Sequence, residues 1–115
     1  MEIPKEAQPY LQKIQMQTQQ LQQVLLQRQS ISLQLAEVNK ALEELRKVKN
    51  EDVFKAVGPI LIKSEKSSLL KELEERKETL EMQNKKLSEH ESRTREALKD
   101  AQEKVSQLVR PAAEN

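Results

Sequence analysis

The sequence predicts a mainly α-helical fold, in which a long antiparallel coiled-coil hairpin of two helices carries one β-hairpin at its centre. Three observations predict it. Two long segments contain no proline or glycine, so each can run as one unbroken helix. Apolar residues in both segments recur at alternating spacings of three and four, which is typical of coiled coil. The segment between them is densely apolar and holds the only glycine of the chain.

The first predicted helix covers about residues 10–50 and follows two prolines, Pro4 and Pro9. Its apolar residues form two seams that do not share one seven-residue phase, because a step is lost near Arg28. We therefore expect a local change of supercoil at that point. The first seam comprises Leu11, Ile14, Thr18, Leu21 and Leu25, and the second comprises Ile31, Leu35, Val38, Leu42 and Leu45.

The central segment, about residues 52–64, is predicted to form two strands joined by a turn at Gly58 and Pro59. Neither face of this β-hairpin is patterned for water, and an isolated two-stranded hairpin is marginally stable in water. We therefore expect strands from other chains to complete it. The residues expected to mediate subunit assembly are Val53, Phe54, Val57, Gly58, Ile60, Leu61 and Ile62.

The second predicted helix covers about residues 66–110 and is closed by Pro111. Polar residues take several of its seam positions, so we expect the middle of the coiled coil to be held weakly. Because the connector is short, the helices can fold back on each other, and residues 1–115 are expected to form a single domain. The seam comprises Leu70, Leu73, Leu80, Leu87, Leu98, Ala101, Val105 and Leu108, with Lys77, Asn84, Glu91 and Thr94 in the polar positions.

The first helix differs from the second in chemistry, because Ile14 to Gln27 contains no charged residue and is rich in glutamine. Glutamine tolerates water yet costs far less than a charge to desolvate, and methionine adapts to more than one shape. The two chain ends are expected to meet there in an adaptable binding surface. An alternative stays open, in which these residues are only seam and frayed ends. This terminal surface comprises Ile3, Tyr10, Leu11, Ile14, Met16, Val105, Leu108 and Val109.

Composition limits the class of protein. The chain has 115 residues, of which 36% are hydrophobic, 34% charged and 2% aromatic, so it lacks the bulk for a compact core and should be elongated. It has no cysteine, which excludes disulfides and thiol chemistry and fits a reducing compartment. No apolar stretch approaches the ~20 residues of a membrane span. We expect a soluble, cytoplasmic protein with no membrane partner.

No arrangement of catalytic, cofactor-binding or metal-binding residues is recognisable. His90 is the only histidine, and the single glycine excludes a glycine-rich phosphate loop. The carboxylates lie on exposed helices, where no enclosed pocket would shift their pKa values. The net charge of +1 and the two aromatic residues, one Tyr and one Phe, leave nothing to attract or stack on nucleic acid. We expect neither an enzyme nor a nucleic-acid-binding protein.

One family accounts for this combination. The segment from Val53 to Lys63, which reads VFKAVGPILIK between two long helices, resembles the prefoldin family. The glutamine-rich opening helix and the segment from Lys40 to Leu45 also resemble that family. An alpha-type subunit carries two hairpins between its helices, whereas this connector has room for one. The resemblance is therefore to a beta-type subunit.

The resemblance implies an ATP-independent chaperone. In that family, two alpha-type and four beta-type subunits join their hairpins into a β-barrel platform, and six coiled coils bind unfolded proteins at their tips. The clients pass to a group II chaperonin. On this sequence the hairpin would serve assembly, and the terminal surface would contact clients or chaperonin, with no cofactor. The alternative is a passive coiled-coil scaffold or tether between partner proteins, which gives no reason for the hairpin.

Overall fold

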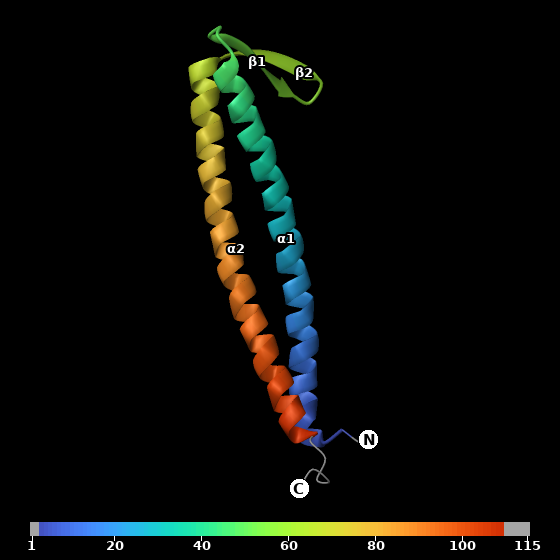
Figure 1. Ribbon diagram of the computed structural model, residues 1–115. Coiled ribbons are helices and arrows are strands. Elements are labelled where there is room, and N and C mark those ends of the chain that lie inside the picture. The colour runs from blue at the N-terminus through green and yellow to red at the C-terminus, as the bar shows by residue number, and fades with distance from the viewer. Residues whose placement is uncertain (1–2, 110–115) are drawn as a thin grey trace. The chain divides into compact units, whose positions relative to one another are not determined.

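The computed structural model describes residues 3–109 and confirms a mainly helical chain with one antiparallel β-hairpin between two long helices (Figure 1). The predicted continuation of the second helix to Arg110 lies outside the described residues. The elements in order are the 3-10 helix η1 at Lys5–Ala7, helix α1 at Gln8–Lys47, strand β1 at Asp52–Val57, strand β2 at Ile60–Glu65 and helix α2 at Lys66–Leu108.

The chain falls into two compact units. Unit 1 contains the described parts of Met1–Arg28 and Lys86–Asn115, and unit 2 contains Gln29–Lys85. In unit 1 the start of α1 lies antiparallel to the end of α2 (Figure 1). In unit 2 the end of α1 lies antiparallel to the start of α2, and the β-hairpin joins them. Each unit therefore buries apolar residues between two helical segments.

The buried face of α1 follows one unbroken repeat, and the break expected near Arg28 is wrong. Val24 is 3% exposed, whereas Leu25 is 41% exposed and Thr18 is also exposed. Buried or half-buried residues recur alternately three and four apart from η1 to the end of α1. They are Ala7, Tyr10, Ile14, Gln17, Leu21, Val24, Arg28, Ile31, Leu35, Val38, Leu42 and Leu45.

Helical phase explains the correction. Val24 precedes Ile31 by seven residues and so lies on the same face, whereas Leu25 is rotated by about 100° toward solvent. The predicted seam contained Leu25, the larger of the two apolar residues. The position in the seven-residue repeat nevertheless decides that Val24 is the buried one. Arg28 consequently occupies a seam position itself.

The predicted seam of α2 is confirmed. Leu80 is 2% exposed and Ala101 is 2% exposed, and most other seam residues are half-buried. Thr94, a polar seam residue, is 3% exposed, and its hydroxyl donates a hydrogen bond to the His90 carbonyl at 2.8 Å. This bond satisfies the buried hydroxyl within its own helix, so the polar seam position costs little. Leu108, the last seam residue, is 37% exposed.

The β-hairpin has a two-residue turn. β1 and β2 pair antiparallel, with Asp52 opposite Glu65 at the base and Val57 opposite Ile60 at the turn. Gly58 has a backbone φ of 57°, which residues other than glycine rarely adopt. Because Pro59 fixes a negative φ at the next position, the pattern is that of a type II′ turn, whose twist suits the flanking strands. Within residues 3–109, neither helix is apolar enough over sufficient length to cross a lipid bilayer.

Candidate functional site

The β-hairpin exposes its apolar side chains. Phe54 is 65% exposed and Leu61 is 70% exposed. In the part of the chain that the structure describes, β1 and β2 form a sheet of two strands only. Five large hydrophobic residues of the assembly set named above are at least 48% exposed, namely Phe54, Val57, Ile60, Leu61 and Ile62. Such a ribbon offers both strand edges and both faces to other chains.

The two faces of the hairpin differ in their surroundings. Val53 and Ser64 lie opposite each other on one face, and both are half-buried. On the same face, the Lys55 ammonium lies 2.5 Å from a carboxylate oxygen of Glu72 in α2. Phe54, Ala56 and Leu61 lie on the other face, because side chains alternate along a strand. The first face is therefore tied to the hairpin's own helix near its base, whereas Val57, Ile60 and Ile62 on that face are exposed toward the turn. The second face is also exposed.

The base of the hairpin is joined to the start of α2 through Glu51. One oxygen of its carboxylate accepts hydrogen bonds from the Ser67 hydroxyl at 2.6 Å and the Ser67 backbone N–H at 3.0 Å. These bonds hold the pKa of Glu51 below its ordinary value. The Lys66 N–H donates to the Glu51 carbonyl at 2.7 Å. Glu51 thus caps a helix start that carries no acidic residue in its first turn.

A positively charged side chain at the start of α2 joins it to the end of α1. The Lys66 ammonium donates to the Val48 carbonyl at 2.6 Å, just beyond the last residue of α1. A cation there interacts favourably with the carbonyl end of the helix dipole. Arg46 and Glu74 also form an ion pair between α1 and α2. These two contacts join the ends of α1 and α2 beside the hairpin, and the hairpin itself is tied to α2 through Lys55 and Glu72.

The terminal surface is assembled in unit 1, and it divides into two groups. Tyr10, Leu11, Ile14 and Val105 are half-buried along the seam, and Val109 is half-buried beyond the last turn of α2. The exposed members are Ile3 at 52%, Met16 at 56% and Leu108 at 37%. Ala7, which the sequence did not single out, is fully buried there. Its small size and its place in the seven-residue repeat, seven before Ile14, were the available signals.

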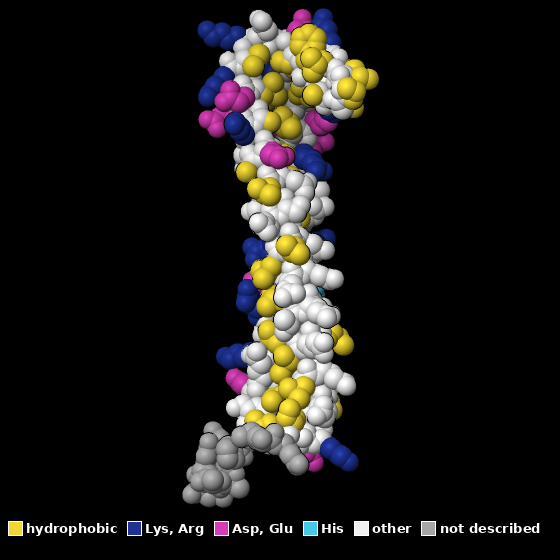
Figure 2. All heavy atoms as spheres, turned by 90° about the vertical axis from the view of Figure 1, so that its right-hand side faces the viewer, with side chains coloured by type: hydrophobic (Ala, Val, Ile, Leu, Met, Phe, Trp, Pro, Cys, Tyr) yellow, Lys and Arg dark blue, Asp and Glu magenta, His cyan; other side chains and the backbone are white. Residues whose placement is uncertain are grey.

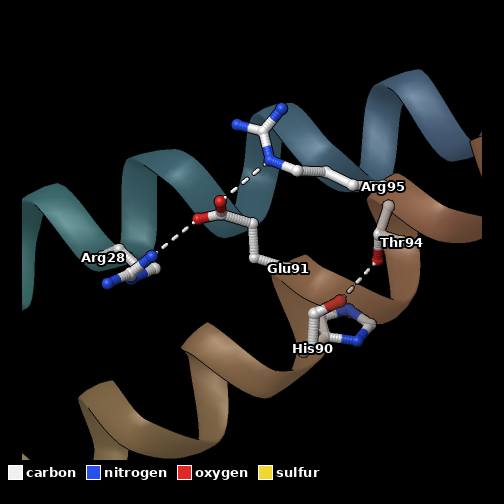
Figure 3. A network of polar contacts seen from close by, with 5 residues as sticks. All are labelled: Arg28, His90, Glu91, Thr94 and Arg95. Carbon is white, nitrogen blue, oxygen red and sulfur yellow. Dashed lines mark hydrogen bonds and ion pairs between the residues drawn. The ribbon is translucent and has the colours of Figure 1, made fainter.

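A polar layer crosses the seam of unit 1. Figure 3 shows Arg28 reaching from α1 to Glu91 on α2, with N–O distance 2.8 Å, while Arg95 binds the other carboxylate oxygen at 2.9 Å. The two guanidinium groups, Arg95 foremost, hold the pKa of Glu91 below its ordinary value. The Glu91 side chain is 17% exposed and that of Arg28 is 33% exposed. The apolar seam of unit 1 thus contains an ion pair that joins the two helices.

Within residues 3–109, no cluster of three or more histidine, cysteine or carboxylate side chains could hold a metal ion. Sequence reasoning missed the contacts of Glu51 with Ser67 and of Lys55 with Glu72. Both join residues 16 or 17 apart across the hairpin. Helical and strand periodicities contain no signal for such pairs.

Comparison with known proteins identifies the family. The family model for prefoldin subunits matches residues 8–112. The prefoldin subunit beta of Archaeoglobus fulgidus is 44% identical over 70 residues, which is 60% of each chain. That of Saccharolobus islandicus is 41% identical over 57 residues, which is 50% of this chain and 45% of the relative. The chain therefore aligns with only about half of the length of these curated relatives.

A solved structure is similar over nearly the full length. The crystal structure of the prefoldin beta subunit from Thermococcus strain KS-1 superposes with a TM-score of 0.87 and 34% identity. The superposition covers 96% of this chain and 97% of that chain. The arrangement of two long helices with one β-hairpin between them therefore matches the fold of that structure. The chain belongs to the prefoldin subunit family, and its resemblance to the beta-type subunit is confirmed.

Proposed function

We propose that this chain is a subunit of an ATP-independent chaperone that binds unfolded proteins and transfers them to a group II chaperonin. The observation that carries the proposal is the exposed hairpin, in which Phe54 and Leu61 are 65% and 70% exposed. Leaving such side chains in water is unfavourable, so the hairpin has a function only where other chains cover it. Because this chain belongs to the prefoldin family, other prefoldin subunits are the chains that would cover it.

Assembly is proposed to occur through the hairpin alone. Strands of neighbouring subunits would pair with the edges of β1 and β2, and a closed barrel would leave no exposed edge. The stoichiometry that we propose is two alpha-type and four beta-type subunits. The contacts at the hairpin base, from Ser67 to Glu51 and from Lys66 to Val48, support this arrangement because they join both helices of the chain beside the hairpin that would enter the barrel.

Clients are proposed to bind at the terminal surface of unit 1. It combines exposed Ile3, Met16 and Leu108 with half-buried seam residues. Several such surfaces in one assembly would hold a client by many weak contacts at high local concentration. Release would need no nucleotide hydrolysis. A cytoplasmic location, where chaperonin and nascent chains are present, is part of the proposal.

The function is tested by producing the full chain with and without an alpha-type subunit. Native mass spectrometry is expected to give a hexamer of two alpha-type and four copies of this chain. Light scattering is expected to show that the hexamer suppresses aggregation of a diluted denatured protein without ATP. A hexamer that leaves aggregation unchanged would instead support a passive scaffold or tether. A persistent monomer would contradict the proposed role of the hairpin.

A further inference from the structure

The outward face of α1 carries no charge between the exposed Lys13 and the seam residue Arg28. Between Ile14 and Gln27 there is no acidic or basic residue, although the whole chain has 20 basic and 19 acidic residues. The charge that follows, Arg28, lies in the seam and pairs with Glu91. Large apolar side chains are exposed on the same stretch, with Met16 at 56%, Leu25 at 41% and Leu26 at 66%. Exposed glutamines separate them, at Gln15, Gln19, Gln22, Gln23 and Gln27.

This surface differs from that of α2. Met82 on α2 is 55% exposed, close to the exposure of Met16, but it lies among Glu81, Lys85 and Lys86. Figure 2 looks onto the α1 side, and there the part of α1 in unit 1 is mainly white and yellow, for uncharged and hydrophobic side chains. The two helices therefore share the seam chemistry but present different surfaces to solvent.

Glutamine side chains match the chemistry of an unfolded backbone. Each amide carries donor and acceptor groups of the same kind as a peptide bond, and it can bind either the N–H or the C=O of an extended chain. The Thr18 hydroxyl on this stretch already donates to the Ile14 carbonyl at 2.7 Å. Glutamine amides and apolar side chains are therefore the groups that a bound segment would meet, and covering them desolvates no charge.

We propose that this charge-free face, from Gln15 to Gln27 on α1, binds segments of unfolded polypeptide whatever their net charge. The proposal rests on the proposed chaperone function and deepens it. It names the class of client segment and extends the contact from the terminal surface along the helix. Because no fixed charge attracts or repels the client, binding depends on exposed backbone amides and apolar side chains, which all unfolded chains share.

The charge pattern favours an unfolded client over the charged surface of α2 in a second copy of this chain. A second copy that placed the outer side of α2 here would have to desolvate Lys and Glu side chains against a surface with no counter-charge. A folded partner with a charged surface would meet the same cost. An unfolded segment can instead turn its charged side chains toward solvent and its backbone toward the glutamines.

The test introduces charge of either sign. Gln15, Gln19 and Gln22 are exposed and are spaced four and three apart, so they share one face of α1. One triple variant carries Gln15→Glu, Gln19→Glu and Gln22→Glu, and its mirror carries Lys at the same positions. Hexamers with an alpha-type subunit are titrated with two fluorescent unfolded polypeptides of equal length and apolar content, one strongly basic and one strongly acidic.

The wild-type hexamer is expected to bind both polypeptides with similar affinity at all salt concentrations. In low salt the Glu variant should bind the basic polypeptide about three- to tenfold more tightly and the acidic one correspondingly less tightly. The Lys variant should reverse this order. A sign reversal cannot arise from loss of folding, which would weaken both. Met16→Lys is expected to act like the Lys variant, whereas the matched Met82→Lys on α2 should bind both polypeptides as wild type does.

Three results would overturn the inference. Unchanged binding in both triple variants, with wild type still active, would place the client elsewhere while leaving the chaperone function intact. A changed hexamer mass in the triple variants would mean that another subunit covers this face. A wild-type hexamer that binds neither polypeptide would refute the proposed function itself, and the inference with it.

Discussion

At the scale of single residues, the most informative position is Arg28. A charged side chain in an apolar seam is costly unless it is paired, and here it binds Glu91, which also accepts from Arg95. Ion pairs of this kind contribute less to stability than apolar packing does, and their best-attested role is to specify alignment. We interpret the layer as the feature that fixes the alignment of α1 against α2 in unit 1.

Replacement of both partners tests this interpretation. The double variant Arg28→Leu with Glu91→Leu is expected to raise the thermal midpoint by about 4–8 °C at neutral pH, because apolar packing replaces desolvated charges. Circular dichroism measures the midpoint. Disulfide trapping between cysteines introduced on the two helices should show more than one alignment in the variant. A lower midpoint would mean that the ion pair is a net source of stability.

The pKa direction of Glu91 adds a pH dependence to the same experiment. Its folded-state pKa is depressed, so the stability from its ionised form is present above the pKa of the unfolded chain. That stability is lost as pH falls through the depressed folded value. The midpoint of the wild type should therefore fall more steeply than that of the double variant below about pH 4.

At the scale of the elements, the hairpin and the helices differ in how far the chain itself buries their apolar side chains. The helices bury Leu42 and Leu80 within the chain, at 1% and 2% exposure. The hairpin leaves most of its apolar side chains exposed, and only its base is held, by Glu51 and by the Lys55 contact with Glu72. An isolated hairpin of two strands is marginally stable, so under the proposed assembly other subunits would supply the rest of its stability, whereas that of the helices begins within one chain.

Charges placed on the hairpin test its role. Phe54→Asp together with Leu61→Asp is expected to disperse the assembly, with subunit affinity lowered at least about 100-fold, because two unpaired carboxylates would be buried. Native mass spectrometry measures the species. Leu33→Asp is the matched control, since Leu33 is 63% exposed but lies on α1. A hexamer that survives the double substitution would contradict assembly through the hairpin.

At the scale of the whole molecule, the surfaces proposed for assembly and for client binding belong to different units. The hairpin belongs to unit 2, and the terminal surface belongs to unit 1. Substitutions in one unit should therefore change one activity and spare the other, because sites that share no contacting residues contribute independently.

Serine substitution in unit 1 tests that separation. Ile14→Ser with Leu108→Ser is expected to lower the apparent affinity for an unfolded client about tenfold, since each lost contact is repeated across the assembly. The hexamer mass should not change. Leu35→Ser is a suitable control, because Leu35 is a half-buried seam residue of unit 2. Equal client protection by the double variant and wild type would remove the terminal surface from the proposed site.

Local chemistry was enough to predict the fold class and the apolar β-hairpin between the helices. Helices without Pro or Gly, and the apolar segment around Gly58, follow from backbone preferences and periodicity that neighbouring residues define. The choice between Val24 and Leu25 could not be made in the same way. Both are apolar, and the phase of the whole helix against its partner selects the buried one.

Contacts between residues that are far apart in the sequence could not be predicted from the sequence, and only the folded chain reveals them. The cap from Glu51 to Ser67, the tie from Lys55 to Glu72 and the pair of Arg28 with Glu91 form because folding brings their elements together. Each residue alone resembles any surface charge of a helical protein. The residue types thus specify which surfaces must be covered, and the three-dimensional arrangement specifies which charges meet, because electrostatic contacts follow distance in space and not separation in sequence.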